Sequence, residues 1–206
     1  MNNWLNERSK LLAKYAEQEI KKANHIQLSL DKPDCGWINA HFMVNNIEKT
    51  YVEFSDVYEP FTDIKKWLED IAYNQYRFKY APSMVDIDCE GYNAFLYYEP
   101  IIWGTGLINH KHYKYYGLFY IYETHNDQIT LDAFCDTWEF VKTFYSSIIE
   151  YAKDMQNYDK FIDEWVWHAY NSEMSDYDED SPELKELFLN KMKSEEVENY
   201  IKKFRR

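Results

Sequence analysis

Hydrophobic residues recur at two different periods along the chain, and these periods divide it into predicted helices and strands. From Trp4 to Lys22 they fall largely at helical spacing with charged residues on the other side, which predicts an amphipathic helix. Alternation with a period of two then predicts three strands, in HIQLSLDK, GWINAHFMVNN and KTYVEFSD. Turn residues in PDCG and NN separate these strands.

The stretch SDVYEPFTDIKKWLEDIAYNQ returns to helical spacing and raises the question of what its tryptophan does. Pro60 suits a first helical turn, and Asp63 places negative charge near the positive N-terminal pole of a helix. Trp67 shares the apolar face of this helix, and lysine and acidic residues take the opposite face. We therefore expect Trp67 to point into a core.

Strand patterning resumes in FKYAPSMVDIDCEG, NAFLYYEPIIWG, HYKYYGLFYIYET and QITLDAF, with EGYN and THND as turns. A long helix is then predicted over DTWEFVKTFYSSIIEYAKDM, where Asp136 and Glu139 stand in capping-box register. The order of elements predicts an α+β fold. We expect a mainly antiparallel sheet of about six or seven strands, packed against amphipathic helices on one face.

The domain organisation follows from a change in composition near the C-terminus. Residues 1–170 are predicted to form a single α+β domain, and 171–206 an acidic linker followed by a C-terminal helix. The segment NSEMSDYDEDSPE gathers acidic residues without a base, as exposed linkers do. Ser181 and Pro182 then mark a helix start. Whether this helix docks on the domain or stays mobile is open from the sequence.

The charge balance narrows the classes of partner. The chain of 206 residues has 36 acidic and 23 basic side chains, a net charge of −13. This balance argues against nucleic acid and against an anionic membrane surface, both of which are bound through clustered lysine and arginine. It favours a basic protein partner, and simple solubility is the more common explanation of an acidic composition. The aromatic share of 19% predicts that some rings reach the surface.

Signatures of metal, cofactor or nucleophilic chemistry are absent. The three cysteines, Cys35, Cys89 and Cys135, form no CxxC pair, so we expect reduced thiols. His110 and His112 lack a third ligand at zinc spacing, and His41 is interpreted as a strand residue with its hydrogen bonds satisfied. No GxSxG, GxGxxG or GxxxxGK[ST] motif occurs. No signal peptide or membrane span is predicted, which makes the cytoplasm the expected location.

Three carboxylates in VDIDCEG form one candidate site. Asp86, Asp88 and Glu90 alternate along a predicted strand and should therefore share one face. Side chains at this spacing project in parallel, whereas catalytic carboxylates converge from different elements. We interpret them as a solvated strand face or as a contact surface for a cationic partner.

The tyrosine block YKYYGLFYIY is the second candidate, because both faces of this predicted strand are aromatic. One face can pack on the helices. The other either lies under a further layer or is exposed as a patch for a partner. The candidate partner-binding tyrosines are Tyr113, Tyr115, Tyr116, Tyr120 and Tyr122.

The block YVEFSDVYEPFTDIKKWLEDIA, the strands through VDIDCEGYNAFLYY and the helix DTWEFVKTFYSSIIEYA together resemble a layout of small uncharacterised bacterial α+β proteins. Some of these are predicted immunity proteins of polymorphic toxin systems. The resemblance covers 51–152 and implies a non-catalytic antitoxin that masks a toxin.

The functional hypothesis is therefore a protein-binding domain, immunity-like, that holds a basic partner. One alternative is an enzyme with an Asp/Glu/His pocket assembled from distant residues. Another is a structural homo-oligomer that pairs through its tyrosine-rich face.

Overall fold

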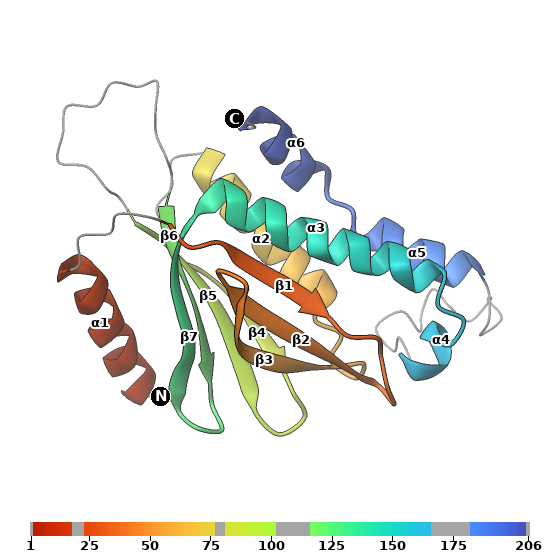
Figure 1. Ribbon diagram of the computed structural model, residues 1–206, viewed down its shortest axis with the longest axis horizontal. Helices are drawn as coiled ribbons and strands as arrows, with labels where there is room; N and C mark the ends of the chain where they lie inside the picture. Colours follow the sequence, from red (N-terminus) through yellow and green to blue (C-terminus); the bar gives the residue numbers. More distant parts are fainter. Residues whose placement is uncertain (1, 18–22, 77–80, 102–115, 166–181, 205–206) are drawn as a thin grey trace.

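The computed structural model describes residues 2–17, 23–76, 81–101, 116–165 and 182–204 (Figure 1). Its elements follow in the order α1 (Asn2–Glu17), β1 (Ile26–Leu30), β2 (Trp37–Val44), β3 (Ile47–Ser55), α2 (Phe61–Tyr76), β4 (Ser83–Asp88), β5 (Asn93–Ile101), β6 (Tyr116–Glu123), β7 (Gln128–Asp136), α3 (Thr137–Gln156), α4 (Phe161–Glu164), α5 (Pro182–Met192) and α6 (Glu195–Lys203). The predicted α+β class is confirmed, and the strands pair antiparallel.

The expectation of one sheet is corrected by the strand pairing. A three-stranded sheet has the order β1-β2-β3, and a four-stranded sheet has the order β4-β5-β6-β7. An isolated parallel bridge links the two sheets, between Asn24, just before β1, and Cys135 on β7. The Asn24 amide donates to the Phe134 carbonyl over 2.7 Å. The strand pattern of the sequence predicts strands but contains no signal for this interruption.

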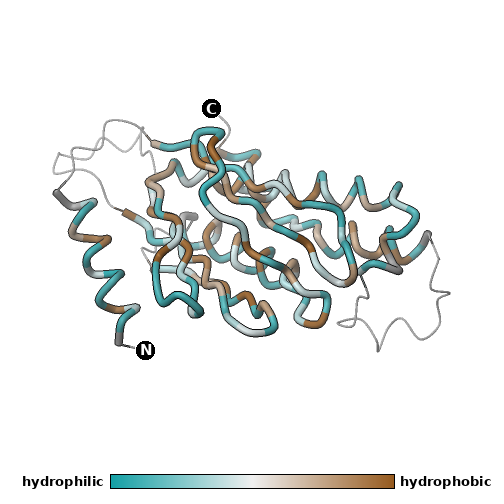
Figure 2. The backbone as a smooth tube through the Cα atoms, turned by 60° about the horizontal axis from the view of Figure 1, so that its bottom comes forward, coloured by the Kyte–Doolittle hydropathy of each residue, from teal (hydrophilic) through white to brown (hydrophobic). Residues whose placement is uncertain are grey.

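The strands alternate between the core and the solvent, as their period predicts. Side chains along β2 are alternately half-buried and buried through all its residues. Hydrophobic and hydrophilic positions alternate in the same way along the tube in Figure 2. The inward side chains of both sheets meet α2 and α3, and together they form the main hydrophobic core.

Trp67 lies in that core, as predicted. Its side chain is 1% exposed, and its ring lies 5.7 Å from Phe140 and 6.3 Å from Phe144 between ring centroids. The α3 helix begins with the predicted cap, because the Asp136 side chain accepts a hydrogen bond from the Glu139 amide. Burial of aromatic rings at the meeting of α2 and α3 therefore fixes the helical layer on the sheets.

Helices lie on both faces of the four-stranded sheet, which corrects the expectation of one face. In Figure 1, α2 and α3 lie across one side of the sheets and α1 stands alone on the other. Leu11 of α1 is buried against Leu118 and Tyr120 of β6. The sequence shows that α1 is amphipathic but does not show which surface its apolar face covers.

The C-terminal segment is docked in the structure, and it contains two helices where one was expected. Ser194 separates α5 from α6 and caps α6 through the Val197 amide. Its own amide donates to the Tyr145 hydroxyl of α3 over 2.8 Å. Apolar side chains of both helices join the main core: Leu184, Phe188, Met192, Val197 and Tyr200. The acidic linker of 171–181 lies outside the described residues.

Candidate functional site

The loops at one end of the two sheets bring together acidic residues that are far apart in the sequence. Glu164, at the end of α4, accepts two backbone hydrogen bonds from the turn before β2. The Cys35 amide donates to its carboxylate over 2.8 Å, and the Gly36 amide donates to its carbonyl over 2.7 Å. The Asp56 amide, just after β3, donates to the Gly36 carbonyl over 2.9 Å. Asp34, Asp56 and Glu164 are thereby held around one turn.

Gly36 is required at this turn for two reasons. Its φ is +86°, a conformation that side-chain-bearing residues rarely adopt. A Cβ at this position would also lie 3.0 Å from Oδ1 of Asp56. The glycine therefore allows the Asp56 carboxylate to lie against the turn.

A second set of contacts continues the acidic surface from β3 to β4. The buried Ser55 hydroxyl at the end of β3 donates to the Glu90 carboxylate in the β4–β5 turn. The Glu90 amide donates to Oδ1 of Asp88 over 2.9 Å, and Nδ2 of Asn93 donates to Asp86 over 2.8 Å. These contacts link the acidic residues of β4 to those around Gly36.

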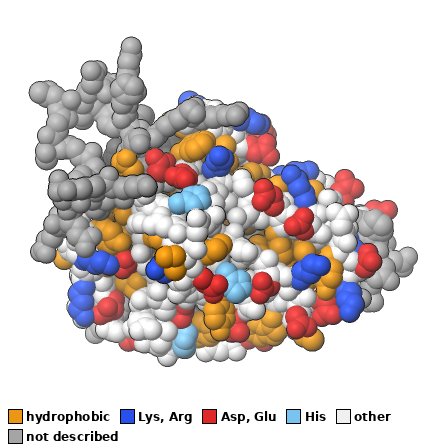
Figure 3. All heavy atoms as spheres, viewed as in Figure 1, with side chains coloured by type: hydrophobic (Ala, Val, Ile, Leu, Met, Phe, Trp, Pro, Cys, Tyr) orange, Lys and Arg blue, Asp and Glu red, His pale blue; other side chains and the backbone are white. Residues whose placement is uncertain are grey.

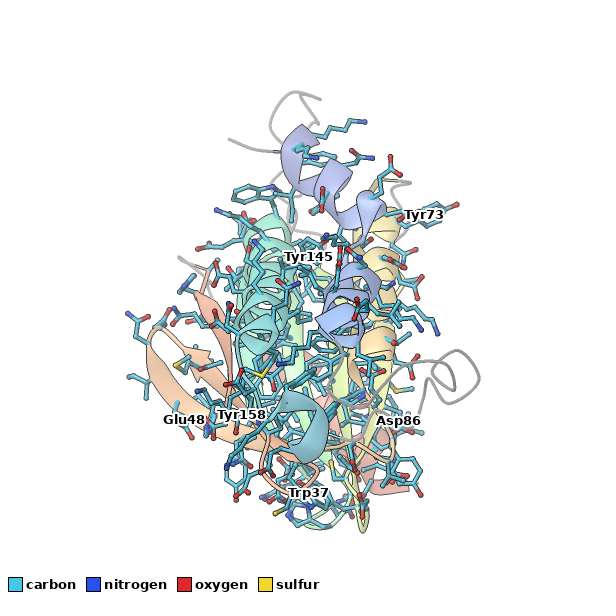
Figure 4. All side chains as sticks on the ribbon, turned by 90° about the vertical axis from the view of Figure 1, so that its right-hand side faces the viewer. Trp37, Glu48, Tyr73, Asp86, Tyr145 and Tyr158 are labelled. Carbon is cyan, nitrogen blue, oxygen red and sulfur yellow. The ribbon has the colours of Figure 1, made fainter. Side chains whose placement is uncertain are left out.

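We call the resulting surface the acidic band. Its carboxylates belong to Asp34, Asp56, Asp86, Asp88, Glu90 and Glu164. In Figure 4 the labels of Trp37, beside the Gly36 turn, and of Asp86 lie toward the same end of the molecule, opposite Tyr73. The exposed side chains of Val57 and Tyr58 follow Asp56 in the chain, and each is about half accessible, at 50% and 51%. The band therefore has an apolar and aromatic component beside its charges.

The charges of the band are mostly uncompensated by bases within the described residues. No described lysine or arginine forms an ion pair with Asp34, Asp86, Asp88, Glu90 or Glu164. Two other acids on the outer face of the four-stranded sheet differ in this respect, because Glu99 pairs with Arg8 and Asp132 with Lys14, both of which belong to α1. The field of the band is thus available to an external cation.

Asp34, Cys35 and Glu164 offer ligand atoms within 4.8 Å of one another, a span that one cation can bridge. The hydrogen bond to Asp34 raises the pKa of the Cys35 thiol. A raised pKa disfavours the thiolate, which is the form that binds metals. The Cys35 thiol is therefore a poor metal ligand, and the carboxylates of Asp34 and Glu164 belong to the acidic band.

Glu59 follows the exposed Val57 and Tyr58 in the chain, is buried, and caps the first turn of α2. Its carboxylate accepts from the Phe61 amide over 2.6 Å and from the Thr62 hydroxyl over 3.0 Å. Burial raises the pKa of Glu59 to about 7. The start of α2, next to the acidic band, therefore has a carboxyl group that titrates near neutral pH.

The three predicted acidic residues do not all share a strand face. Asp86 and Asp88 lie on the outer face of β4, but β4 ends at Asp88. Glu90 occupies the turn with a φ of +54° and points toward Ser55. The expectation that Glu90 continues the strand is wrong, because the chain reverses direction at Glu90 and Gly91 to form the β4–β5 hairpin.

The structure places the predicted partner-binding tyrosines in different environments. Tyr120 is fully buried and Tyr122 is 6% exposed, because this face of β6 lies under α1. Tyr97 stacks between Trp4 of α1 and Tyr120, at centroid distances of 5.0 and 4.9 Å. Of the two alternatives for this face, the covering layer is the one observed for Tyr120 and Tyr122.

The remaining tyrosines of the block lie at or beyond the start of β6. Tyr116 is half-buried and stacks on Phe134 at 5.0 Å. Tyr113 and Tyr115 lie outside the described residues, as do His110 and His112. The block therefore contributes core and inter-layer packing where it is described.

Glu123 is the buried acid that best fits the enzyme alternative. It accepts from the Thr130 hydroxyl over 2.9 Å and from Nδ2 of Asn126 over 3.2 Å, and Nε2 of His125 lies 3.6 Å from its carboxylate. Thr50 of β3 donates to it over 3.4 Å. These partners surround the carboxylate with donors from both sheets, which is a structural arrangement that ties the sheets together.

His41 has the role expected of it. Its Nε2 lies 3.0 Å from Asp31 and its Nδ1 lies 3.1 Å from Glu48. The hydrogen bond to Asp31 is the main cause of its raised pKa. On the face shown in Figure 3, histidine side chains lie beside acidic and hydrophobic ones.

A groove between α2 and α6 lies at the end of the molecule opposite the band, near Tyr73 in Figure 4. It is lined by Ala72, Tyr73, Glu196, Asn199, Tyr200 and Lys203. A single carboxylate and a single amine there do not make the converging acid and histidine set of the enzyme alternative.

Sequence reasoning found Asp86, Asp88 and Glu90 but missed Asp34, Asp56 and Glu164. The missed residues come from two loops and from the end of α4, and no spacing connects them. The only local signals are turn residues, in PDCG and in FSDV, which predict loops without indicating that the loops meet.

Comparison with known proteins gives no assignment: no family model, no curated protein and no solved structure matches the chain. Within the described residues, no helix combines the length and apolar composition needed to cross a membrane.

Proposed function

We propose that this chain is a non-catalytic binding protein that holds a basic protein through the acidic band. The main observation behind this proposal is that hydrogen bonds hold the carboxylates of the acidic band close together. Most of these carboxylates have no lysine or arginine partner among the described residues. The resemblance to predicted immunity proteins adds a role to this proposal, in which the basic partner is a toxin whose working surface is masked.

The physical basis is complementarity of charge combined with an aromatic anchor. A surface of one sign accelerates encounter with a partner of the opposite sign, and this acceleration falls as salt screens the field. Tyrosine beside such charges provides contact area at small entropic cost, and tyrosines are enriched among residues that dominate binding energy. Tyr58 and Val57 have this position next to Asp56.

The test is a capture experiment with a charge-matched control. A band variant with Asp34→Asn, Asp86→Asn, Asp88→Asn and Glu90→Gln removes four negative charges but keeps oxygen atoms that accept the same hydrogen bonds. A control variant with Asp70→Asn, Glu150→Gln, Asp154→Asn and Glu186→Gln removes the same charge from exposed helical positions. Each protein is tagged and used to capture partners from cells that naturally produce the chain, at low and at high salt.

The proposal predicts one stoichiometric basic protein with the wild type and the control, released by salt and missing with the band variant. Equal capture by all three proteins would contradict the placement of the site. Light scattering across a concentration range tests the homo-oligomer alternative, for which the apparent mass would rise with concentration.

A further inference from the structure

The outer edge of β4 has backbone groups that form no hydrogen bond with the described residues of other elements, and the β4–β5 hairpin fixes the direction in which they point. Paired residues of these strands have numbers that sum to 181, as in Asp88 with Asn93. The Cys89 amide donates to the Tyr92 carbonyl over 2.9 Å, and this pair obeys the same sum. Cys89 and Tyr92 are therefore a hydrogen-bonded pair.

Hydrogen-bonded and non-hydrogen-bonded pairs alternate along an antiparallel ladder. Since Cys89 is a hydrogen-bonded position, Ile87 and Val85 also bond to β5, while Asp88, Asp86 and Met84 do not. The Asn93 carbonyl agrees with this alternation. It accepts a hydrogen bond from the Thr124 amide, on the β6 side of β5, over 3.0 Å, and therefore points away from Asp88. The amides and carbonyls of Met84, Asp86 and Asp88 therefore point away from β5.

No described element pairs with these outward groups. β4 is the terminal strand of its sheet, and it forms no backbone hydrogen bond with another described element on its free side. The same three residues have their side chains on the outer face, where Met84 is 49% exposed and Asp86 is exposed. Val85 and Ile87 are buried on the other face and pack in the main core.

We infer that the free edge of β4 accepts an extended segment of a basic protein, which adds to the sheet as a further strand. This inference rests on the proposed function and specifies how the partner binds. An added strand would hydrogen bond to Met84, Asp86 and Asp88, and its residues opposite them would lie on the outer face. Lysine or arginine at those alternate positions would stand directly across from the two carboxylates, a favourable cross-strand pair.

The alternative meaning of charged residues on an edge strand is protection against aggregation. The two meanings differ in what they require of the backbone. Protection needs only the charges of Asp86 and Asp88, whereas strand addition also needs the outward amides.

The probe is a synthetic peptide of alternating lysine and threonine, matched in length to β4. Two further peptides have the same sequence with N-methyl groups on alternate amides, one peptide for each of the two possible registers. Both keep the charge, and in one of them the methyl groups replace the amide hydrogens that would bond to the edge. On the protein side, Met84→Pro removes one outward amide without removing a β5 hydrogen bond, a position where an edge strand tolerates proline. Met84→Ala is its matched control.

We expect the unmodified peptide to bind wild type and Met84→Ala, and to bind Met84→Pro at least about tenfold more weakly. One methylated register should lose binding to the same degree. Amide hydrogen exchange gives a readout independent of the variants. Exchange at Met84 and Asp86 should be fast in the free protein and slow in the complex, while Val85 and Ile87 stay protected in both.

Equal binding of the unmodified and the methylated peptides, and equal binding by both Met84 variants, would overturn strand addition and leave a surface that binds by charge alone. The capture result of the band variant would then still support the proposed function. Failure of the unmodified peptide to bind at low salt would also overturn the inference. A concentration-dependent dimer of the free protein that Met84→Pro abolishes would show that a second copy occupies the edge, and would contradict the assignment to a basic partner. Failure of the proposed function itself is distinguishable, because then capture would not depend on the band.

Discussion

The hydroxyl of Ser55, the last residue of β3, donates a hydrogen bond to the carboxylate of Glu90 in the turn between β4 and β5. This contact joins the two sheets at the end opposite the Asn24 bridge. It also places Glu90 beside Asp56, the next residue after Ser55. The geometry of the acidic band thus depends on a buried hydroxyl that has no charge of its own.

Replacing Ser55 with alanine should destabilise the fold by about 1 kcal/mol, the usual contribution of one hydrogen bond. The Val57 amide loses its acceptor in the same change, because it donates to the Ser55 hydroxyl oxygen over 3.1 Å. Glu90→Gln keeps an acceptor for Ser55 and should cost less. Chemical denaturation measures both variants, and a Ser55→Ala midpoint equal to that of the wild type would refute the role of this contact.

Glu59 should make stability fall as pH rises from about 4.5 to about 7. Its pKa is raised from 4.5 to about 7 by burial, so in this range the folded state holds a proton that the unfolded state has lost. More protons bound in the folded state give a negative slope of unfolding free energy against pH, with a total change of about 3 kcal/mol. Urea unfolding at several pH values measures the slope. Glu59→Gln should flatten it, and an unchanged slope would contradict a raised pKa.

His41 should titrate above the ordinary histidine pKa, chiefly because of its hydrogen bond to Asp31 and secondarily because of Glu48. Asp31→Asn should lower its pKa more than Glu48→Gln does. The sign for stability follows from the raised value: the contribution is complete below about pH 6.5 and is lost as pH rises through the folded pKa. Proton NMR of the imidazole gives the three titration curves, and equal effects of the two substitutions would show that the order of causes is wrong.

Gly117 of β6 lies against the ring of Tyr98 on β5, and a Cβ at Gly117 would overlap the Cζ and hydroxyl of that ring. Tyr98 is buried and its hydroxyl is hydrogen bonded to Thr137 at the start of α3. Gly117→Ala should therefore destabilise the protein by roughly 1 to 3 kcal/mol, as overpacking does. Gly91→Ala is the matched control, since no atom lies within 4 Å of a Cβ placed there. Equal melting temperatures for the two variants would contradict the tight packing.

The sequence predicts most individual elements because each depends on a local period. Trp67 is assigned to the core from the helical spacing of its neighbours, and the cap of α3 from Asp136 and Glu139. The division into two sheets and the bridge between Asn24 and Cys135 involve residues far apart in the sequence, more than a hundred positions for this bridge, and no local pattern encodes them. The packing of α1 over Tyr120 could not be predicted for the same reason, because it joins residues that are far apart in the sequence.

The residues of the candidate site also divide into those that a local pattern predicts and those that only tertiary contacts bring together. Asp86 and Asp88 are predicted on one strand face because alternation is a local property. Glu90 leaves that face because the two-residue turn of Glu90 and Gly91 follows Cys89, and a positive φ at a glutamate is not expected from its residue type. Asp34, Asp56 and Glu164 join the site only through tertiary contacts around Gly36, which bring two loops and the end of α4 together.

The most direct test of the binding account is the association rate between this protein and the basic partner that it captures. The wild type and the helical control variant should associate quickly at low salt and more slowly as salt increases, with a smaller effect on dissociation. A variant with Asp86, Asp88 and Glu90 changed to alanine should associate more slowly and should lose most of the salt dependence. An association rate and a salt dependence equal to those of the wild type would contradict the assignment of binding to the acidic band.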